Sequence, residues 1–219
     1  MKRSVIALSL CALSGLAQAG VIDFNRSNIV CTAAGTGLGT TIACGNGSVL
    51  AQSYGDVAGS LDVSYASLNQ PNSSLRVWDA DYNNLRGVVY GDGNDGNSAA
   101  RIDLLGLGGK GVTLSHFDLG AYSNTSRGTH LTISAIGGPV LYSYDGNVGG
   151  LPGNIASSFD GNWSSASGLR IEWRNSAYNV GIDNITYAVT AVPEPSAYLM
   201  LGAGLFGLGL LARRTARRG

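Results

Sequence analysis

Residues 111–122 read Gly-Val-Thr-Leu-Ser-His-Phe-Asp-Leu-Gly-Ala-Tyr, and this stretch decides the fold class. Apolar and polar residues alternate along it, which is typical of a β-strand with one buried face. Similar short runs recur through the central part of the chain, separated by Gly, Asn, Asp and Ser. Outside the two termini, no window carries the apolar stripe of an amphipathic helix. The sequence therefore predicts an all-β protein with a single antiparallel β-sandwich.

The number and spacing of these runs indicate a sandwich of jelly-roll type. Turn signals separate the runs, among them Gly137-Gly138, Asp145-Gly146 and Asp160-Gly161, and Asp145-Gly146 is predicted to be the turn of a hairpin. The predicted strands cover residues 21–24, 40–43, 61–65, 75–78, 87–90, 100–105, 112–122, 130–135, 140–144, 155–159, 169–173 and 180–189.

The N-terminal segment, residues 1–19, has the order of a secretory signal peptide. Lys2 and Arg3 precede an apolar run over residues 5–16, and Ala17-Gln18-Ala19 forms an Ala-x-Ala cleavage site. The apolar run is short for a membrane helix. We therefore expect cleavage by signal peptidase before Gly20 and export of the remaining chain.

An uncharged apolar segment, residues 197–212, lies close to the C-terminus and is followed by an Arg-rich tail over residues 213–219. As a helix it would cover about 24 Å, slightly less than the hydrocarbon core of about 30 Å. The tail arginines can snorkel and should stay cytoplasmic. We expect a transmembrane anchor with residues 20–192 outside the cell.

The tripeptide Pro193-Glu194-Pro195 stands directly before this apolar segment. Tripeptide, apolar stretch and terminal arginines together resemble the PEP-CTERM sorting signal, over residues 192–219. The resemblance implies that an exosortase, a membrane transpeptidase-like enzyme, cuts near the tripeptide and releases or transfers the protein outside. It also implies a Gram-negative bacterium that exports polysaccharide, with the protein at the cell surface or in the extracellular matrix. The two prolines keep the segment extended, as a protease groove requires. A Pro-containing linker before an ordinary anchor is the alternative.

Two segments are similar to β-sandwich domains that often precede this signal. Residues 111–122 resemble a strand of the type V-x-L-x-S-F-D-L, and residues 180–187 resemble the closing D-N-I/V strand of galactose-binding-like jelly rolls. The resemblance implies a structural calcium ion held by Asp183 together with Asp23, completed by backbone carbonyls. The alternative is that Asp183 and Asn184 cap a turn. The sequence predicts no other cofactor.

Residues 20–191 form the predicted secreted domain, and their charge limits the partners that it can have. Between residues 20 and 192 there are 13 acidic and 8 basic residues, which gives a net charge near −5. Nucleic-acid binding requires a basic face, so we expect no nucleic-acid partner. A chain of this length is sufficient for one domain with its own core.

Cysteine usage points to an oxidising compartment. Cys11 leaves with the signal peptide, and Cys31 and Cys44 remain as a pair. A disulfide closing residues 31–44 would stabilise the fold by roughly 3 kcal/mol in the chain-entropy model. Two free buried thiols or half of a metal site are the alternatives.

Signatures of catalysis are missing from the sequence, and we predict that the protein is not an enzyme. It contains no Gly-x-Ser-x-Gly, His-Glu-x-x-His or phosphate-binding loop motif. His116 and His130 are the two histidines, and Glu172 is the only glutamate before the sorting signal. A hydrolase with a pair of loop carboxylates is the third-ranked hypothesis.

Two functional hypotheses come first. In one, the chain is a non-enzymatic exported protein of the surface or extracellular matrix, sorted by an exosortase. In the other, it is a carbohydrate-binding module that contacts exopolysaccharide through loop aromatics, because ring faces bind the apolar side of sugars. Trp163 is expected in an exposed loop and is the first sugar-contact candidate, and Trp78 is the second.

Overall fold

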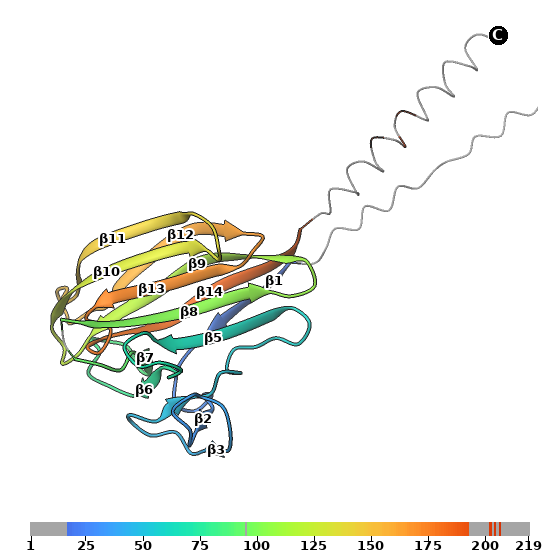
Figure 1. Cartoon of the computed structure of the whole chain (residues 1–219). Coiled ribbons are helices and arrows are strands. Elements are labelled where there is room, and N and C mark those ends of the chain that lie inside the picture. The colour runs from blue at the N-terminus through green and yellow to red at the C-terminus, as the bar shows by residue number, and fades with distance from the viewer. Residues whose placement is uncertain (1–16, 95, 193–201, 203, 205, 207–219) are drawn as a thin grey trace, which may run out of the picture.

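The computed structural model describes residues 17–94, 96–192, 202, 204 and 206. Between residues 17 and 192, the described chain forms fourteen β-strands and no helix. All strand pairs are antiparallel, and they form two sheets that face each other (Figure 1). The predicted all-β antiparallel fold is confirmed. The predicted signal peptide lies almost wholly, and the C-terminal anchor for the most part, outside the described residues.

The larger sheet has nine strands in the order β12-β9-β14-β7-β6-β4-β2-β3, and β1 also pairs with β14. Its strands are β1 (Gln18–Ile22), β2 (Cys31–Thr32), β3 (Thr41–Ile42), β4 (Val49–Leu50), β6 (Arg76–Trp78), β7 (Val88–Tyr90), β9 (Lys110–Ala121), β12 (Ser157–Ser165) and β14 (Val180–Ala191).

The smaller sheet has five strands in the order β11-β10-β13-β8-β5. Its strands are β5 (Leu61–Ser67), β8 (Ser98–Gly106), β10 (Ser126–Ala135), β11 (Val140–Gly149) and β13 (Leu169–Asn175).

The core lies between the two sheets because one face of each strand is apolar. In β5, for example, Leu61, Val63 and Tyr65 are buried while the residues between them point outward. Trp173 of β13 is fully buried, and its indole nitrogen donates to the carbonyl oxygen of Val180 at 2.9 Å. Burial of this apolar face is the main force that holds the sheets together.

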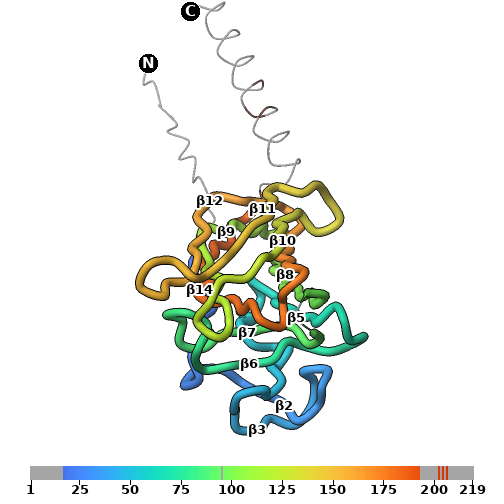
Figure 2. The backbone as a smooth tube through the Cα atoms, turned by 90° about the vertical axis from the view of Figure 1, so that its left-hand side faces the viewer, coloured from blue at the N-terminus to red at the C-terminus, as the bar shows by residue number. Residues whose placement is uncertain are grey.

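The two ends of the described domain lie side by side. Gln18 of β1 pairs with Val189 of β14, so the chain enters and leaves at the same end of the sandwich (Figures 1 and 2). The predicted cleavage after Ala19 falls within β1. It would leave the pairs of Gly20, Val21 and Ile22 with β14 intact.

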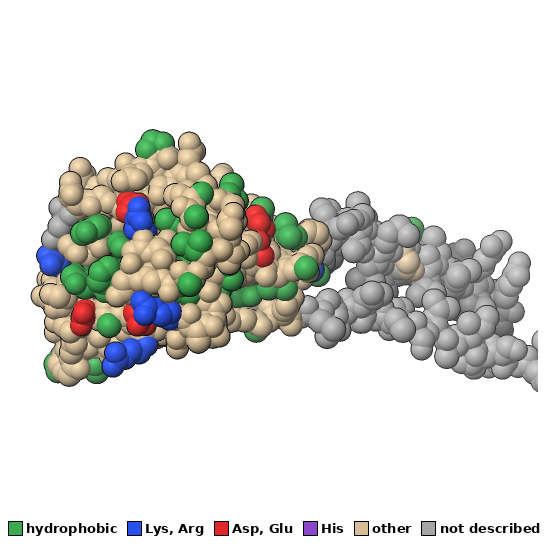
Figure 3. Space-filling model, turned by 90° about the horizontal axis from the view of Figure 1, so that it is seen from below, with side chains coloured by type: hydrophobic (Ala, Val, Ile, Leu, Met, Phe, Trp, Pro, Cys, Tyr) green, Lys and Arg blue, Asp and Glu red, His purple; other side chains and the backbone are tan. Residues whose placement is uncertain are grey.

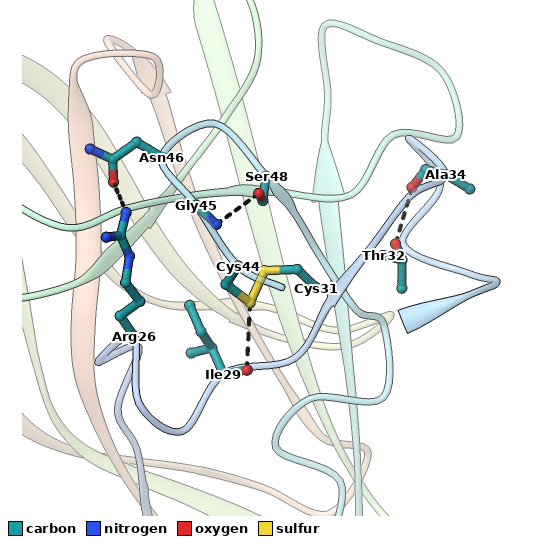
Figure 4. The surroundings of a disulfide bond; sticks show 9 residues. All are labelled: Arg26, Ile29, Cys31, Thr32, Ala34, Cys44, Gly45, Asn46 and Ser48. Carbon is teal, nitrogen blue, oxygen red and sulfur yellow. Dashed lines mark hydrogen bonds between the residues drawn. A yellow bond between two sulfur atoms is a disulfide. The ribbon is translucent and has the colours of Figure 1, made fainter. Parts of the chain in front are cut away.

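The predicted disulfide between Cys31 and Cys44 is present, with the two Cα atoms 5.3 Å apart (Figure 4). It links β2 to the residues just after β3, and each of these two strands has only two residues. Nearby, Arg26 donates to the side-chain oxygen of Asn46 at 2.8 Å. The disulfide compensates for the small amount of regular pairing in this segment.

Two turn predictions are wrong. Asp145-Gly146 lies within β11, and the β10–β11 turn is formed instead at Gly137-Gly138, where Gly137 has a φ of 70°. Asp160-Gly161 lies within β12, at a bulge in its pairing with β9. Asp-Gly pairs favour turns, but here the neighbouring strand supplies the backbone hydrogen bonds and keeps them extended.

Charged residues are sparse in this chain, at 13% of the sequence. On the face in Figure 3, basic and acidic side chains of the described residues lie interspersed among uncharged ones. In the part of the chain that the structure describes, no helix is long and apolar enough to cross a bilayer.

Candidate ligand-binding site on the outer face of the larger sheet

Two paired glycines create a flat strip on the outer face of the larger sheet. Gly120 of β9 lies opposite Gly181 of β14. A Cβ on Gly120 would lie 2.4 Å from the carbonyl oxygen of Tyr82, and one on Gly181 would lie 2.6 Å from Val88. Only glycine therefore lets the segment between β6 and β7, residues 79–87, rest directly on the sheet.

Asn83 fixes this segment in place from a buried position. Its side-chain oxygen accepts from the backbone N–H of Ala121 at 2.6 Å, and its amide donates to Asn154 at 2.9 Å and Thr125 at 3.2 Å. The φ of Asn83 is 56°, a left-handed conformation that asparagine tolerates better than most residues. A second, smaller apolar cluster forms around this segment, made of Tyr82, Leu85, Val88, Tyr90 and Ala156.

Next to this cluster, five aromatic rings and one amide side chain surround a cavity of about 110 Å³. One water occupies roughly 10–15 Å³ of such space, so the cavity has room for a small ligand group. We call it the Trp78 pocket. Its lining residues are Trp78, Tyr82, Tyr90, Tyr122, Tyr178 and Asn179.

The rings of the Trp78 pocket hold each other by edge-to-face contacts. The centroid of Trp78 lies 6.3 Å from that of Tyr90 and 5.7 Å from that of Tyr122, with interplanar angles of 78° and 82°. Tyr82 and Tyr90 are buried and form the inner wall, whereas Tyr178 is 42% exposed at the rim. Such pairs are favourable, so the pocket is preformed.

Burial keeps the hydroxyl groups of Tyr82 and Tyr90 in the Trp78 pocket uncharged. Burial raises the pKa of Tyr90 to about 12, against the opposing charge of Arg76, and burial also raises the pKa of Tyr82. The Tyr82 hydroxyl donates to the carbonyl oxygen of Tyr178 at 3.1 Å. The side-chain amide of Asn179 forms no hydrogen bond with the residues that the structure describes. Its donor and acceptor are therefore not used by the described part of the chain.

A second hollow, of about 270 Å³, lies beside residues 84–86 on the same face of the sheet. Asp118 of β9 and Asp183 of β14 are paired in register there. The lining residues are Asp23, Asn25, Asn84, Leu85, Arg86, Asp118, Asp183 and Asn184.

Asp183 has the most perturbed carboxyl group of this hollow. Burial raises its pKa to about 7, and the charges of Asp23 and Asp118 add to the effect, while the N–H groups of Phe24 and Asn184 oppose it. Its Oδ1 accepts from the Phe24 N–H at 2.9 Å. The sandwich therefore holds Asp183 in a place that disfavours its charge.

The structure places Asp23 and Asp183, the two predicted calcium ligands, beside this hollow, together with Asp118, which the prediction did not include. Both Asp118 oxygens are already engaged, one by Ser158 at 2.6 Å and the other by Asn184 at 2.8 Å. Among the described residues, no three His, Cys, Asp or Glu side chains converge to hold a metal ion. Calcium requires six to eight oxygen ligands, so backbone carbonyls would have to complete the site, and calcium binding stays a prediction.

His116 connects this hollow to the edge of the sheet. Its Nδ1 lies 2.8 Å from Asp160 Oδ1, and its Nε2 lies 3.5 Å from Asp118 Oδ2. Burial lowers the pKa of His116, but the two carboxylates outweigh burial and raise it overall. The His116 ring therefore ties β9 to β12.

The expectation that Trp163 lies in an exposed loop is wrong. Trp163 belongs to β12, is half-buried, and lies 5.1 Å from the ring of Tyr142 and 6.1 Å from that of Phe117. It closes the edge of the core because the bulge after Asp160 turns it inward. Trp78, the second candidate, lies in the aromatic pocket.

Sequence reasoning missed the four tyrosines and Asn179 of the Trp78 pocket. Trp78 and Tyr90 are each the last residue of a predicted strand, and the pairing of Trp78 with Val88 places the two rings on one face. The other members come from connections between strands, and only the fold brings them together.

The sequence matches the PEP-CTERM protein-sorting motif over residues 191–218. The chain therefore carries a signal that indicates export and membrane-anchored sorting by an exosortase. The match begins at the last residue of β14. No curated protein matches the chain.

Several solved structures are similar to parts of the chain. They include a GH26-CBM35 β-(1,4)-mannanase of Podospora anserina, with 14% identity over 63% of this chain and a TM-score of 0.35. An exo-β-1,3-galactanase of Phanerochaete chrysosporium has 14% identity over 61% of this chain and a TM-score of 0.31. The chain spans 29% of the length of each of these two enzymes. A family 29 carbohydrate-binding module of Piromyces equi has 12% identity, covers 80% of this chain and 92% of its own, and has a TM-score of 0.31.

Proposed function

We propose that this chain is a non-enzymatic exported protein whose sandwich binds one sugar unit of an extracellular polysaccharide in the Trp78 pocket. The observation that carries the proposal is the meeting of five aromatic rings and an unpaired amide, that of Asn179, in one small cavity. Ring faces pack against the apolar face of a pyranose, and an amide bonds its hydroxyl groups. The neutral tyrosine hydroxyls suit an uncharged sugar.

The position of the pocket in the sandwich supports this function. Asn179 directly precedes β14, and its carbonyl oxygen accepts from the Tyr122 N–H at 2.8 Å. The chain leaves the sandwich at the opposite end of β14, after Ala191. A protein held at its C-terminal end would present the Trp78 pocket away from the membrane.

A hydrolase remains the competing class, and the carboxylates of the second hollow are its candidate acid groups. The engagement of both Asp118 oxygens by Ser158 and Asn184 argues against a role in proton transfer. Turnover of a polysaccharide that is lost in Asp183→Asn would establish the enzyme and contradict the proposal.

The proposal is tested by a glycan array and by calorimetric titration of the exported protein with the glycans that bind. Trp78→Ala should weaken binding by at least about tenfold, equivalent to about 1.4 kcal/mol. Asn179→Ala should also weaken binding, while it leaves the free energy of unfolding within about 0.5 kcal/mol of the wild type, because its side chain bonds no described residue.

Trp163→Phe is the matched control, because Trp163 is the aromatic candidate outside the pocket. It should bind like the wild type. If Trp163→Phe lost binding while Trp78→Ala bound normally, the binding site would lie at the β11–β12 edge and not in the Trp78 pocket. If the wild type bound no glycan, the proposal would be refuted.

A further inference from the structure

An exposed edge strand can pair with a strand of another chain. Most edge strands of this sandwich are too short, too irregular or too well capped for such pairing. β3, at one end of the larger sheet, has only two residues. β12, at the other end, is interrupted by a bulge between Asp160 and Trp163. A strand added at either place would find few backbone groups in register.

The β5 edge of the smaller sheet is long but capped by side chains. Asp56 accepts the N–H of Val63 at 2.8 Å. The amide of Gln52 pairs with both backbone groups of Tyr65, at 2.9 Å to the N–H and 2.7 Å to the carbonyl oxygen. These side chains occupy the groups that an added strand would need.

The opposite edge of the smaller sheet, β11, has ten residues (Figure 1), and side-chain caps reach only its last part, where Asn147 accepts from the Tyr144 hydroxyl and the Gly149 N–H donates to Ser157. In the described part of the chain, the backbone of residues 140–146 forms no hydrogen bond outside its pairing with β10. Val140 and Leu141 are 60% and 39% exposed. Residues 140–144, Val-Leu-Tyr-Ser-Tyr, carry no charge and no Gly or Pro, so this edge has strong β-propensity and no protection.

We propose that β11 pairs antiparallel with β11 of a second copy of this chain and joins two smaller sheets into one. A two-fold axis at Ser143 would place Tyr142 opposite Tyr144 of the other copy, a favourable aromatic pair. It would place Asp145 opposite Leu141, so that no like charges meet. The sequence around Ser143 is therefore self-complementary, as a two-fold interface requires.

A second copy fits this edge better than an open-ended fibre. Antiparallel pairing of an edge with itself is closed by the two-fold axis and leaves no further β11 edge free. The β3, β12 and β5 edges are short, bulged or capped, and β1, which pairs only with β14, has only five residues. Assembly should therefore stop at the dimer. A dimer would hold two Trp78 pockets and bind polysaccharide at two points; that consequence rests on the proposed function, whereas the dimer does not.

The test measures the mass of the exported protein in solution by sedimentation equilibrium from low to high micromolar concentration. Ser143→Lys places two lysines opposite each other at the two-fold axis and should raise the dimer dissociation constant at least about tenfold. Ser64→Lys is the matched control, since Ser64 is an exposed serine on the capped β5 edge, and it should dimerise like the wild type. Circular dichroism confirms that each variant is folded.

Mixing supplies a test specific to the register. Ser143→Asp should also be monomeric alone, and an equimolar mixture with Ser143→Lys should form the heterodimer because opposite charges then meet. A monomeric wild type over the whole range, dimerisation of Ser143→Lys equal to the wild type, or no heterodimer in the mixture would each overturn the proposal.

Discussion

Asp183 is the residue whose surroundings conflict most with its charge. Asp183 is only 3% exposed. Its pKa is raised to about 7, mainly by burial and further by the charges of Asp23 and Asp118. In the unfolded chain its pKa is near 3.9. The folded state therefore binds more protons than the unfolded state between these two values, so stability falls as pH rises through this window.

Asp183→Asn should remove this dependence. Asparagine keeps an oxygen that can accept from the Phe24 N–H and carries no charge. We compare the free energy of unfolding of the wild type with that of the variant. The difference, wild type minus variant, should decrease by up to about 4 kcal/mol between about pH 4 and 7. Above about pH 7 it should stay constant. Denaturant titrations at several pH values measure the difference.

The same variant tests the calcium prediction. If Asp23 and Asp183 bind calcium, adding calcium at pH 8 should raise the stability of the wild type and leave Asp183→Asn unchanged. Equal pH profiles of the two proteins would show that the charge of Asp183 is not a cost to the fold.

Among the elements, the segment over residues 79–87 depends on the glycine pair beneath it. Gly120→Ala would place a methyl group 2.4 Å from the backbone carbonyl oxygen of Tyr82, so the segment must move. We expect a loss of roughly 1–3 kcal/mol in stability and weaker ligand binding, because Tyr82 lines the Trp78 pocket. Thermal unfolding and glycan titration measure the two effects.

Gly35→Ala is the control for this prediction. An added Cβ there meets nothing within 4 Å, so stability and binding should match those of the wild type. A stable Gly120→Ala protein with normal affinity would mean that the position of Tyr82 does not depend on Gly120.

The positions of most strands could be predicted because alternation is local. The stretch 111–122 became β9, and its partner over 180–189 became β14. The turn prediction at Asp145-Gly146 was wrong because these residues pair with β10. The spacing of residues in the sequence cannot reveal that pairing. β2 and β4 were missed because two residues are too short for a pattern.

For the molecule as a whole, the candidate site could be predicted only in fragments. Trp78 and the pair Asp23 and Asp183 were named from sequence, and the fold placed each beside a hollow. Tyr178 and Asn179 could not be predicted as pocket residues. They line the pocket only because the turn between β13 and β14 contacts the residue after β9 in the folded chain. Long-range contacts of this kind define the pocket.

The link between the sandwich and its sorting signal is a property of the whole molecule. β14 is paired with β9 through Ala191, and the Val192 N–H donates to the carbonyl oxygen of Gly109 at 3.2 Å. The sheet therefore holds the chain up to the residue before Pro193. Release from the membrane would then depend on the residues from Pro193 onward and leave the sandwich intact.

Glu194→Ala should block this release, because Glu194 is the charged residue of the tripeptide. We expect an unprocessed protein retained in the membrane fraction, with the greater mass of the uncut chain. Glu172→Ala is the matched control, since Glu172 is the chain's other glutamate. Its loss removes a half-exposed ion pair with Arg174 that contributes at most about 1 kcal/mol, so release should be normal. Fractionation and mass spectrometry distinguish the two proteins. The Glu194→Ala protein could instead be released normally. Its product would then have the mass of the wild-type product, or differ from it only by the substitution itself. That result would mean that sorting does not depend on Glu194.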